Sequence, residues 1–346
     1  MNRALDERTI GHNPERLNLL KGGMNYANAV TTVSPTYRKE TTEGAAGWLS
    51  STLTRDEVRY VDRSIIHTYI YTYIYSFFFF VSIYAPKDLK KKRNSPSSLV
   101  CCSQKYFGVL NGIDTLSWDP TCDMALPAPY SNDFLVGKGL CKRYIQAGLG
   151  LEVDPNKPLV VCITRLVPQK GIHLIAQSIR TTHERGGQFV LLGTGHSDAD
   201  FVQMQQGEFY GSRQVKILLQ YNDTLSRLLY GGSDVTVVPS MFEPCGLTQM
   251  IAMRYGSIPL VRNTGGLADT VKDVGKDPTQ GNGFVFDGTG EKDVEACVIR
   301  ALDLYFEDQA KWEELQMRNM RIDVSWNAAA REYASLYEGL WQTQEL

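Results

Sequence analysis

Short apolar runs alternate with amphipathic stretches from Pro158 onward. The run at 158–164, "PLVVCIT", is short and β-branched, which is typical of a strand buried on both faces. Four apolar residues between Ile172 and Ile179 then follow at i, i+3, i+4 and i+7. This spacing predicts an amphipathic helix that ends near the two glycines at 186–187.

The same alternation repeats along the rest of the chain. We expect further strands at 188–193, 215–221, 234–240 and 258–261. We expect helices at 223–233, 246–256, 291–308 and 326–341, with Asp223 as the N-cap of the first. Strands that alternate with helices imply crossover connections, so the sequence predicts an α/β domain built on a doubly wound parallel sheet.

The first 140 residues show only pieces of this pattern. A helical stretch and the short strand 29–35 are expected within 15–37, and a strand and a turn within 105–120. Neither piece could close a domain alone, so we expect the tail of a domain whose beginning is absent. The predicted organisation is a remnant of an N-terminal domain (1–59), an insert (60–104), the end of that domain with the interdomain linker (105–140), a C-terminal domain (141–325) and a helix packing back toward the N-terminal domain (326–346).

Residues 60–104 differ from the rest of the chain. Ile65 to Pro86 is 22 residues without Asp, Glu, Lys or Arg, long enough to span a bilayer, and the basic run at 87–93 would suit a cytoplasmic flank. Against a membrane helix, Tyr-Ile repeats and four consecutive Phe are what translated AT-repeat and T-rich DNA would give. We therefore expect a disordered or spurious insert, such as a retained intron, with a membrane contact as the alternative. In either form the segment would be prone to aggregation.

Composition and charge narrow the function classes. With 346 residues, 43% hydrophobic content and a net charge of -2, the chain is long enough for about two domains and has no basic excess that would indicate nucleic acid. The seven Cys show neither CxxC nor Cys/His metal spacing, which predicts reduced thiols. The N-terminal sequence lacks the apolar stretch of a signal peptide, and its acidic residues do not suit a transit peptide.

Two cations lie just past the first strand of the doubly wound domain. In open α/β sheets ligands bind at this carboxyl edge, and Arg165 and Lys170 precede a helix whose N-terminus, near Gly171, offers free N–H groups. Two cations beside a helix N-terminus suit a diphosphate. Solvated loop cations are the alternative.

The stretch "PSMFEPCGLTQM" also follows a strand. Its glycine lets the backbone approach a ligand closely, and the N–H groups of Gly246, Leu247 and Thr248 are expected to be unpaired and able to hold a phosphate. Glu243 could accept hydrogen bonds from sugar hydroxyls, or it could cap the helix. The alternative for Cys245 is a small buried hydrophobe, and no His lies near it in sequence to make it a nucleophile.

A third glycine turn, "NTGGLADTV" at 263–271, follows another strand and strengthens the pattern of strand ends that face a ligand. "GTGH" at 193–196 has part of a dinucleotide-binding turn. It lacks the third Gly and the ribose-binding acid, which disfavours a dehydrogenase.

Four stretches together resemble the starch synthases and bacterial glycogen synthases, which extend α-1,4-glucans from ADP-glucose: "CITRLVPQKG", "FEPCGLTQMIAMRYGSIPLVRNTGGLADTV", "LLKGGMNYANAVTTVSPTY" and "GVLNGIDTLSWDP". The resemblance covers 12–59 and 105–341 and is strongest to the plant soluble starch synthases of classes III and IV. It implies a GT-B fold, two Rossmann-like domains facing across a cleft, with the sugar nucleotide held mainly by the C-terminal domain and the anomeric configuration retained. It also implies a plastid location and association with other starch-synthesis enzymes.

The resemblance assigns roles to matching residues. Arg165 and Lys170 would neutralise the ADP diphosphate as it leaves, and Glu243 would hold hydroxyls of the donor glucose. The other donor-binding residues would be Asn111 near the interdomain hinge, Tyr221 against the adenine, Cys245, Gly246, Leu247 and Thr248 around the glucose and phosphate, and Thr264 and Gly265 beside the phosphate. No metal and no cofactor are implied, since the two cations take the place of a metal.

Three departures from the family pattern stand out. The N-terminal Lys-x-Gly-Gly-Leu loop of the family should lie before the start of this chain, and "KGGM" at 21–24 is expected in a helix rather than after the first strand. The insert splits what remains of the N-terminal domain. Ile251 stands where related GT-B enzymes have a second Glu, which is normal for starch synthases.

The leading hypothesis is a starch synthase-like glycosyltransferase, of which this chain is a truncated form with little or no activity, because a GT-B enzyme needs both lips of its cleft. A noncatalytic module that binds ADP-glucose or glucan and acts through partner synthases is the first alternative. A membrane-tethered glycosyltransferase that uses 65–86 is the second.

Overall fold

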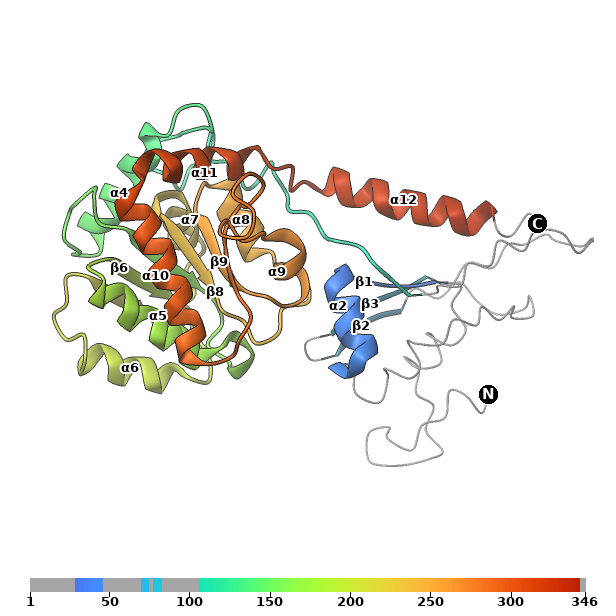
Figure 1. The fold of residues 1–346 in the computed structure, drawn as a ribbon, viewed down its shortest axis with the longest axis horizontal. Helices are drawn as coiled ribbons and strands as arrows, with labels where there is room; N and C mark the ends of the chain where they lie inside the picture. Colours follow the sequence, from blue (N-terminus) through green and yellow to red (C-terminus); the bar gives the residue numbers. More distant parts are fainter. Residues whose placement is uncertain (1–28, 46–69, 75–76, 83–105, 343–346) are drawn as a thin grey trace, which may run out of the picture. The chain divides into compact units, whose positions relative to one another are not determined.

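The computed structural model describes residues 29–45, 70–74, 77–82 and 106–342, which form two compact units (Figure 1). One unit comprises the residues up to 111 together with those from 329 onward, and the other comprises 112–328. The expected helical stretch before residue 29 and most of the 60–104 insert lie outside the described residues. The domain boundaries drawn from the sequence stay predictions.

The first unit contains a small mixed sheet. Its strands are β1 (Ala29–Thr32), β2 (Ile70–Ile74), β3 (Phe77–Ser82) and β4 (Tyr106–Gly108), in the order β2-β3-β1-β4. β1 pairs parallel with β4 and antiparallel with β3. Helix α2 (Pro35–Glu40) follows β1 because Ser34 caps it, its hydroxyl accepting from the Tyr37 N–H at 2.8 Å, and a π-helical turn, η1 (Thr41–Ala45), comes next. The strands expected near 29–35 and within 105–120 are therefore present.

The second unit is built on a six-stranded, fully parallel sheet. Its strands are β5 (Leu159–Ile163), β6 (Gln188–Leu192), β7 (Val215–Leu218), β8 (Val235–Val238), β9 (Ile258–Arg262) and β10 (Phe284–Phe286). Their order is β10-β9-β8-β5-β6-β7. In chain order this is 3-2-1-4-5-6 read from the β7 edge, the doubly wound Rossmann arrangement, which reverses direction between β5 and β8. The doubly wound parallel sheet expected from the sequence is confirmed.

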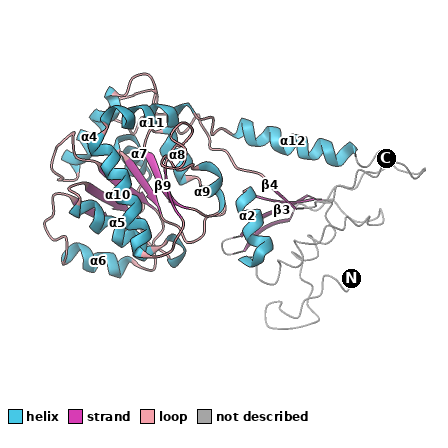
Figure 2. Cartoon of the chain, in the orientation of Figure 1, coloured by secondary structure: helices cyan, strands magenta, loops and turns pink. Residues whose placement is uncertain are grey.

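Alternate residues of each central strand face opposite layers of helices. Val160 and Cys162 of β5 belong to the core under α5 (Ile172–Glu184), α6 (Asp198–Gln206), α10 (Glu291–Glu307) and α11 (Gln309–Arg321). Leu159 and Val161 belong to the core under α4 (Val136–Gly148) and α7 (Asp223–Gly232). Figure 2 shows the strands enclosed between these helices. A strand apolar at every position is what a sheet covered on both faces requires.

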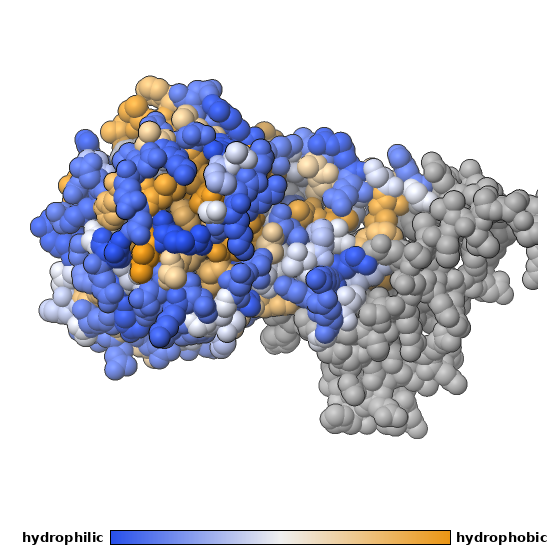
Figure 3. Space-filling model, in the orientation of Figure 1, coloured by the Kyte–Doolittle hydropathy of each residue, from blue (hydrophilic) through white to orange (hydrophobic). Residues whose placement is uncertain are grey.

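Two short helices follow β8 and β9, and one long helix ends the chain. They are α8 (Thr248–Arg254), α9 (Gly265–Thr270) and α12 (Trp326–Gln342), and a 3-10 turn, η3 (Pro168–Lys170), precedes α5. Hydrophilic side chains dominate the surface of the second unit that Figure 3 shows, with a few apolar side chains between them. No helix among the described residues is long and apolar enough to cross a membrane.

The expected cap of α7 was wrong by one residue. Asn222, not Asp223, is the N-cap, and its side chain accepts from the Leu225 N–H at 2.9 Å. Asp223 instead lies inside the first turn and pairs with Arg227 across one turn of helix at 3.1 Å. Asn and Asp cap equally well, so the pattern "YNDTL" does not distinguish them.

Candidate active site

The loops after β5 and β8 meet at the point where the strand order reverses. Met241 N–H donates to the Gln169 carbonyl at 2.8 Å, and the Gln169 amide donates to the Phe242 carbonyl at 2.9 Å. Gly171 lies so close to the second loop that a Cβ on it would fall 2.3 Å from the Pro239 carbonyl oxygen, and its φ of 71° also favours glycine. The turn that opens α5 is therefore fixed against the end of β8.

Lys170 and Glu243 form an ion pair across these two loops. Each side chain is 15% exposed. The same carboxylate oxygen accepts a hydrogen bond from the Ser240 hydroxyl at 2.8 Å. Arg165 is exposed at the end of β5 and takes part in no ion pair within the described part of the chain. One cation is thus held by a carboxylate, and a second lies exposed five residues earlier in the same loop.

The loop after β9 packs against the backbone of Glu243. The Gly266 N–H donates to the Glu243 carbonyl at 3.0 Å. Gly265 has a φ of 46°, and a Cβ on it would fall 2.1 Å from that carbonyl oxygen. Thr264, just before it, is buried. Three loops, from three neighbouring strands, therefore share one compact edge of the sheet.

The residues between Glu243 and α8 present backbone toward this edge. Gly246 has a φ of 63°, and the N–H groups of Gly246, Leu247 and Thr248 have no hydrogen-bond partner within the described residues. Leu247 is exposed and Cys245 half-buried. Burial raises the pKa of the Tyr230 phenol, and the Thr248 hydroxyl acts in the opposite direction. The expected helix start at 246 lies two residues later, because Gly246 turns the chain before α8 begins.

Two predicted residues belong to other segments than these three loops. Tyr221 follows β7, three residues beyond the strand's end, and its side chain is 86% exposed. The expected strand 215–221 is thus shorter, and Tyr221 belongs to the loop. Asn111 belongs to the other compact unit. The roles assigned to all eleven site residues stay predictions at this point.

The comparisons with known proteins agree with this architecture. Residues 150–316 match the family model "Glycosyl transferases group 1", and residues 4–54 match "Starch synthase catalytic domain". The chain is 42% identical to the probable chloroplastic/amyloplastic starch synthase 4 of Arabidopsis thaliana over 93% of its length, and 35% identical to the glycogen synthase of Protochlamydia amoebophila over 94%. The chain belongs to the starch synthase and glycogen synthase family of glycosyltransferases.

A solved structure of the same family has the same fold. The catalytic domain of starch synthase IV from Arabidopsis thaliana, bound to ADP and acarbose, matches 95% of this chain with a TM-score of 0.76 and 40% identity. The GT-B fold class expected from the sequence is confirmed. The chain spans 27% and 59% of the lengths of the two relatives above, and 59% of the solved chain.

Sequence reasoning missed the polar partners that hold these family motifs in place. Ser240 bonds Glu243, Arg262 donates to the Met241 carbonyl at 2.9 Å, and Gln249 bonds Thr270 at 2.9 Å. Arg262 and Thr270 come from other segments than the residues they contact, so no local spacing reveals those two pairs, whereas Ser240 lies three residues before Glu243. The only signal was that Ser240 and Gln249 lie within or beside the "FEPCGLTQ" stretch.

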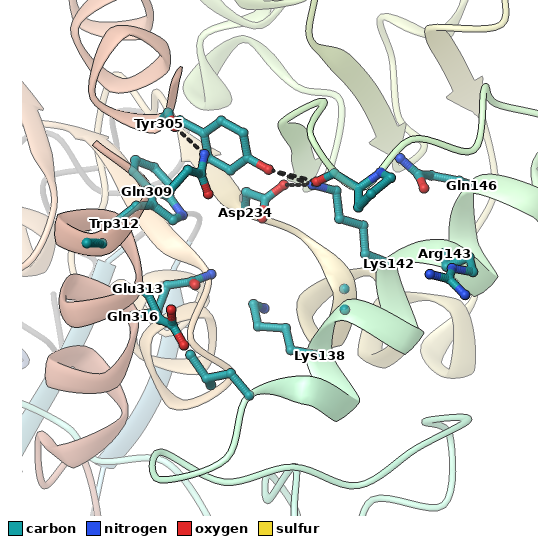
Figure 4. Close-up of a pocket in the computed structure, with 15 residues that line it drawn as sticks. Lys138, Lys142, Arg143, Gln146, Asp234, Tyr305, Gln309, Trp312, Glu313 and Gln316 are labelled. Carbon is teal, nitrogen blue, oxygen red and sulfur yellow. Dashed lines mark hydrogen bonds and ion pairs between the residues drawn. The ribbon is translucent and has the colours of Figure 1, made fainter. Parts of the chain in front are cut away.

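A cavity of about 430 Å³ lies elsewhere, at the amino end of β8 (Figure 4). Asp234, just before that strand, is paired with Lys142 at 2.7 Å, and Lys142 also donates to the Tyr305 hydroxyl at 2.8 Å. Lys138 donates to the backbone carbonyls at the ends of α7 and α8. Both lysines thus already bond to protein oxygens, and Arg143 and Glu313 also line the cavity. None of the predicted site residues lines it.

Among the described residues, no group of His, Cys, Asp or Glu is arranged to hold a metal.

Proposed function

We propose that the chain is a starch synthase-like glucosyltransferase, which transfers glucose from ADP-glucose to the non-reducing end of an α-1,4-glucan with retention of configuration. The observation that carries this proposal is the Lys170–Glu243 pair at the strand-order reversal of a parallel sheet, with Arg165 exposed beside it. Ligands bind at such reversals, and the family to which the chain belongs acts on sugar nucleotides there.

The two cations suit the diphosphate of the donor. Developing negative charge on a leaving diphosphate is stabilised by fixed cations in a site of low water content. The thirteen-residue helix α5 begins just past Lys170 and adds the partial positive charge of its N-terminus. Arg165 and Lys170 would therefore bind the diphosphate and stabilise it as the glycosidic bond breaks.

Glu243 would act on the sugar rather than on the phosphate. A carboxylate accepts hydrogen bonds from hydroxyl groups, and this one already accepts from Ser240, while the Gly266 N–H fixes the backbone carbonyl of the same residue. The N–H groups of Gly246 to Thr248 would face the phosphates, Cys245 would line the glucose pocket and Thr264 would contribute backbone. Tyr221 would stack on the adenine, and Asn111 would contact the sugar.

Binding and turnover separate this proposal from a noncatalytic module. We expect the chain to bind ADP, measured by calorimetry, and we expect R165A or K170A to weaken that binding at least about tenfold, as loss of one charge-assisted contact does. The matched control R321A removes an exposed arginine that pairs only with Asp133. Transfer of labelled glucose from ADP-glucose to glycogen then reports catalysis. ADP binding without any transfer would favour the module, and no ADP binding would overturn both.

The proposed location is a plastid. Its support is that two plant relatives, starch synthases 4 and 3 of Arabidopsis thaliana, are named as chloroplastic/amyloplastic. Bacterial glycogen synthases are also close relatives, so localisation of the native protein by immunogold labelling is the test. Label outside plastids would contradict the proposal.

A further inference from the structure

A buried glutamine joins two of the three loops at the candidate active site. Gln249, the second residue of α8, is fully buried. Its amide nitrogen donates to the Gly246 carbonyl and to the Thr270 hydroxyl oxygen, the latter at 2.9 Å. The Thr270 hydroxyl in turn donates to the Gly266 carbonyl at 2.6 Å. A chain of hydrogen bonds therefore runs from Gly246 through Gln249 and Thr270 to the start of α9.

The hydrogen-bond partners fix the orientation of this amide. A carbonyl oxygen can only accept, so Gly246 must face the nitrogen of Gln249. The Thr270 hydroxyl gives its one proton to Gly266, so its oxygen must accept from the same nitrogen. The Gln249 oxygen Oε1 then accepts no hydrogen bond from either, and it is buried without a partner within the described residues.

An unpartnered buried acceptor is unfavourable for folding. An apolar side chain of similar length would avoid that penalty, so stability alone does not account for a glutamine at this position. Its two donated bonds connect two parts of the chain whose relative position shapes the candidate site. On one side is the turn at Gly246, where a Cβ would fall 2.6 Å from the Gln249 nitrogen. On the other is Gly266, whose N–H holds the Glu243 carbonyl at 3.0 Å.

We propose that Gln249 is a positioning residue for the sugar-nucleotide site: through Gly246 and Thr270 it fixes the loop 243–248 on α9. This inference rests on the proposed function, because the loop it positions is the one expected to hold the donor. Gln249 acts through these neighbours and touches no reacting atom. Misplacement of a site by about 1 Å can change rates on the order of 100-fold, so a single buried amide is sufficient to matter.

The test uses Q249M, which keeps length and removes both donated bonds, and Q249E, which keeps shape, replaces the donating amide nitrogen by a carboxyl oxygen and adds an ionisable group. T270V removes the hydroxyl, and the double variant Q249M/T270V completes a cycle. The control is Q316M, since Gln316 is also buried and donates one bond, to the Gly256 carbonyl at 3.0 Å. Two quantities are measured on the full chain: the ADP dissociation constant, and amide hydrogen exchange of residues 243–248 and 265–267.

We expect Q249M and Q249E to accelerate exchange in those two segments at least about tenfold and to raise the ADP dissociation constant by a similar factor. Q316M should change neither, and T270V and Q249M should be non-additive because they break one chain of bonds. Unchanged exchange and unchanged ADP affinity in Q249M would overturn the inference while leaving the proposed function intact. If the wild-type chain does not bind ADP but Q249M and Q249E still exchange faster than wild type, the positioning role of Gln249 is confirmed and the proposed function is overturned.

Discussion

Lys170 and Glu243 form an ion pair that joins the loop after β5 to the loop after β8. The carboxylate thus holds the cation that is proposed to meet the diphosphate. A donor that binds Lys170 through its phosphate would replace Glu243 as the counter-ion. Glu243 would then be released to accept hydrogen bonds from the sugar, so one exchange of partners would prepare both ends of the donor.

Replacing the carboxylate separates its two roles. E243Q removes the charge that competes for Lys170, so we expect ADP itself to bind as tightly as to wild type or several-fold more tightly. Transfer of glucose should fall on the order of 100-fold or more, since a neutral amide stabilises developing positive charge on the sugar poorly. Calorimetry with ADP and an assay with labelled ADP-glucose measure the two effects.

The control for E243Q is E314Q, which neutralises an exposed glutamate that pairs with Arg318 on α11. It should alter neither quantity. Weaker ADP binding in E243Q would show that Glu243 supports the diphosphate site instead of competing with it.

Gly265 is expected to be intolerant of any side chain. G265A would place a Cβ 2.1 Å from the Glu243 carbonyl and force a φ of 46° on alanine. G186A is a matched control, because Gly186 has a φ of 80° with nothing within 4 Å of the added carbon. We expect both to lose about 1 kcal/mol of unfolding free energy from the positive φ. Only G265A should lose more and also weaken ADP binding, and equal effects of the two variants would contradict the account.

The exposed ring of Tyr221 is expected to contribute to ADP binding and not to the stability of the fold. Y221A should leave the melting temperature within about 1 °C, because surface changes remove little burial. It should weaken ADP binding by about 1 kcal/mol or more through loss of stacking on the base, yet leave inorganic diphosphate binding unchanged. Y210A is the control, since Tyr210 is 84% exposed, close to the 86% of Tyr221. Equal ADP affinity in both variants would argue against base stacking.

The buried Lys138 is expected to make the unfolding free energy depend on pH. Burial lowers its pKa from 10.5 to about 8, although Asp234 nearby acts in the opposite direction. In the unfolded chain Lys138 keeps its proton up to about pH 10.5, so between pH 8 and 10.5 the unfolded state binds more protons. The contribution of this residue to unfolding free energy should therefore rise with pH across that window and stay constant below it.

Comparison with K138M isolates this effect. The difference in unfolding free energy between wild type and K138M, from urea titrations, should increase by about 3 kcal/mol from pH 8 to 10.5. Parallel curves for the two proteins would mean that Lys138 titrates at its ordinary pKa despite its burial.

The elements that could be predicted from the sequence are those in which the buried residues are apolar. β5, β6 and β8 are buried at nearly every position, which leaves short runs made mostly of apolar residues. Helix α4 went unrecognised because its inward face carries Lys138, Lys142 and Gln146 at successive four-residue steps. Those side chains are buried by bonding to carbonyls, a carboxylate and an amide from distant parts of the chain, which no periodicity of apolar residues can reveal.

The candidate site shows the same division. Its charged residues could be located because they follow strands, and parallel strands end at one edge of the sheet. The pairing of Lys170 with Glu243 depends on β5 and β8 being neighbours in the sheet, although two strands (β6 and β7) and three helices (α5, α6 and α7) lie between them in the chain. The hydrogen bonds of Gln249 depend on α9, a six-residue helix. The sequence predicted only a glycine turn there, so this helix was missed.

A crystal structure of the chain with ADP tests the central claim most directly. The account predicts the diphosphate within hydrogen-bonding distance of Arg165 and Lys170 at the end of β5, with the Lys170–Glu243 pair broken and the carboxylate turned toward the sugar position. An ADP molecule bound elsewhere, for example in the cavity beside Lys142 and Tyr305, or an intact pair beside bound ADP, would contradict it.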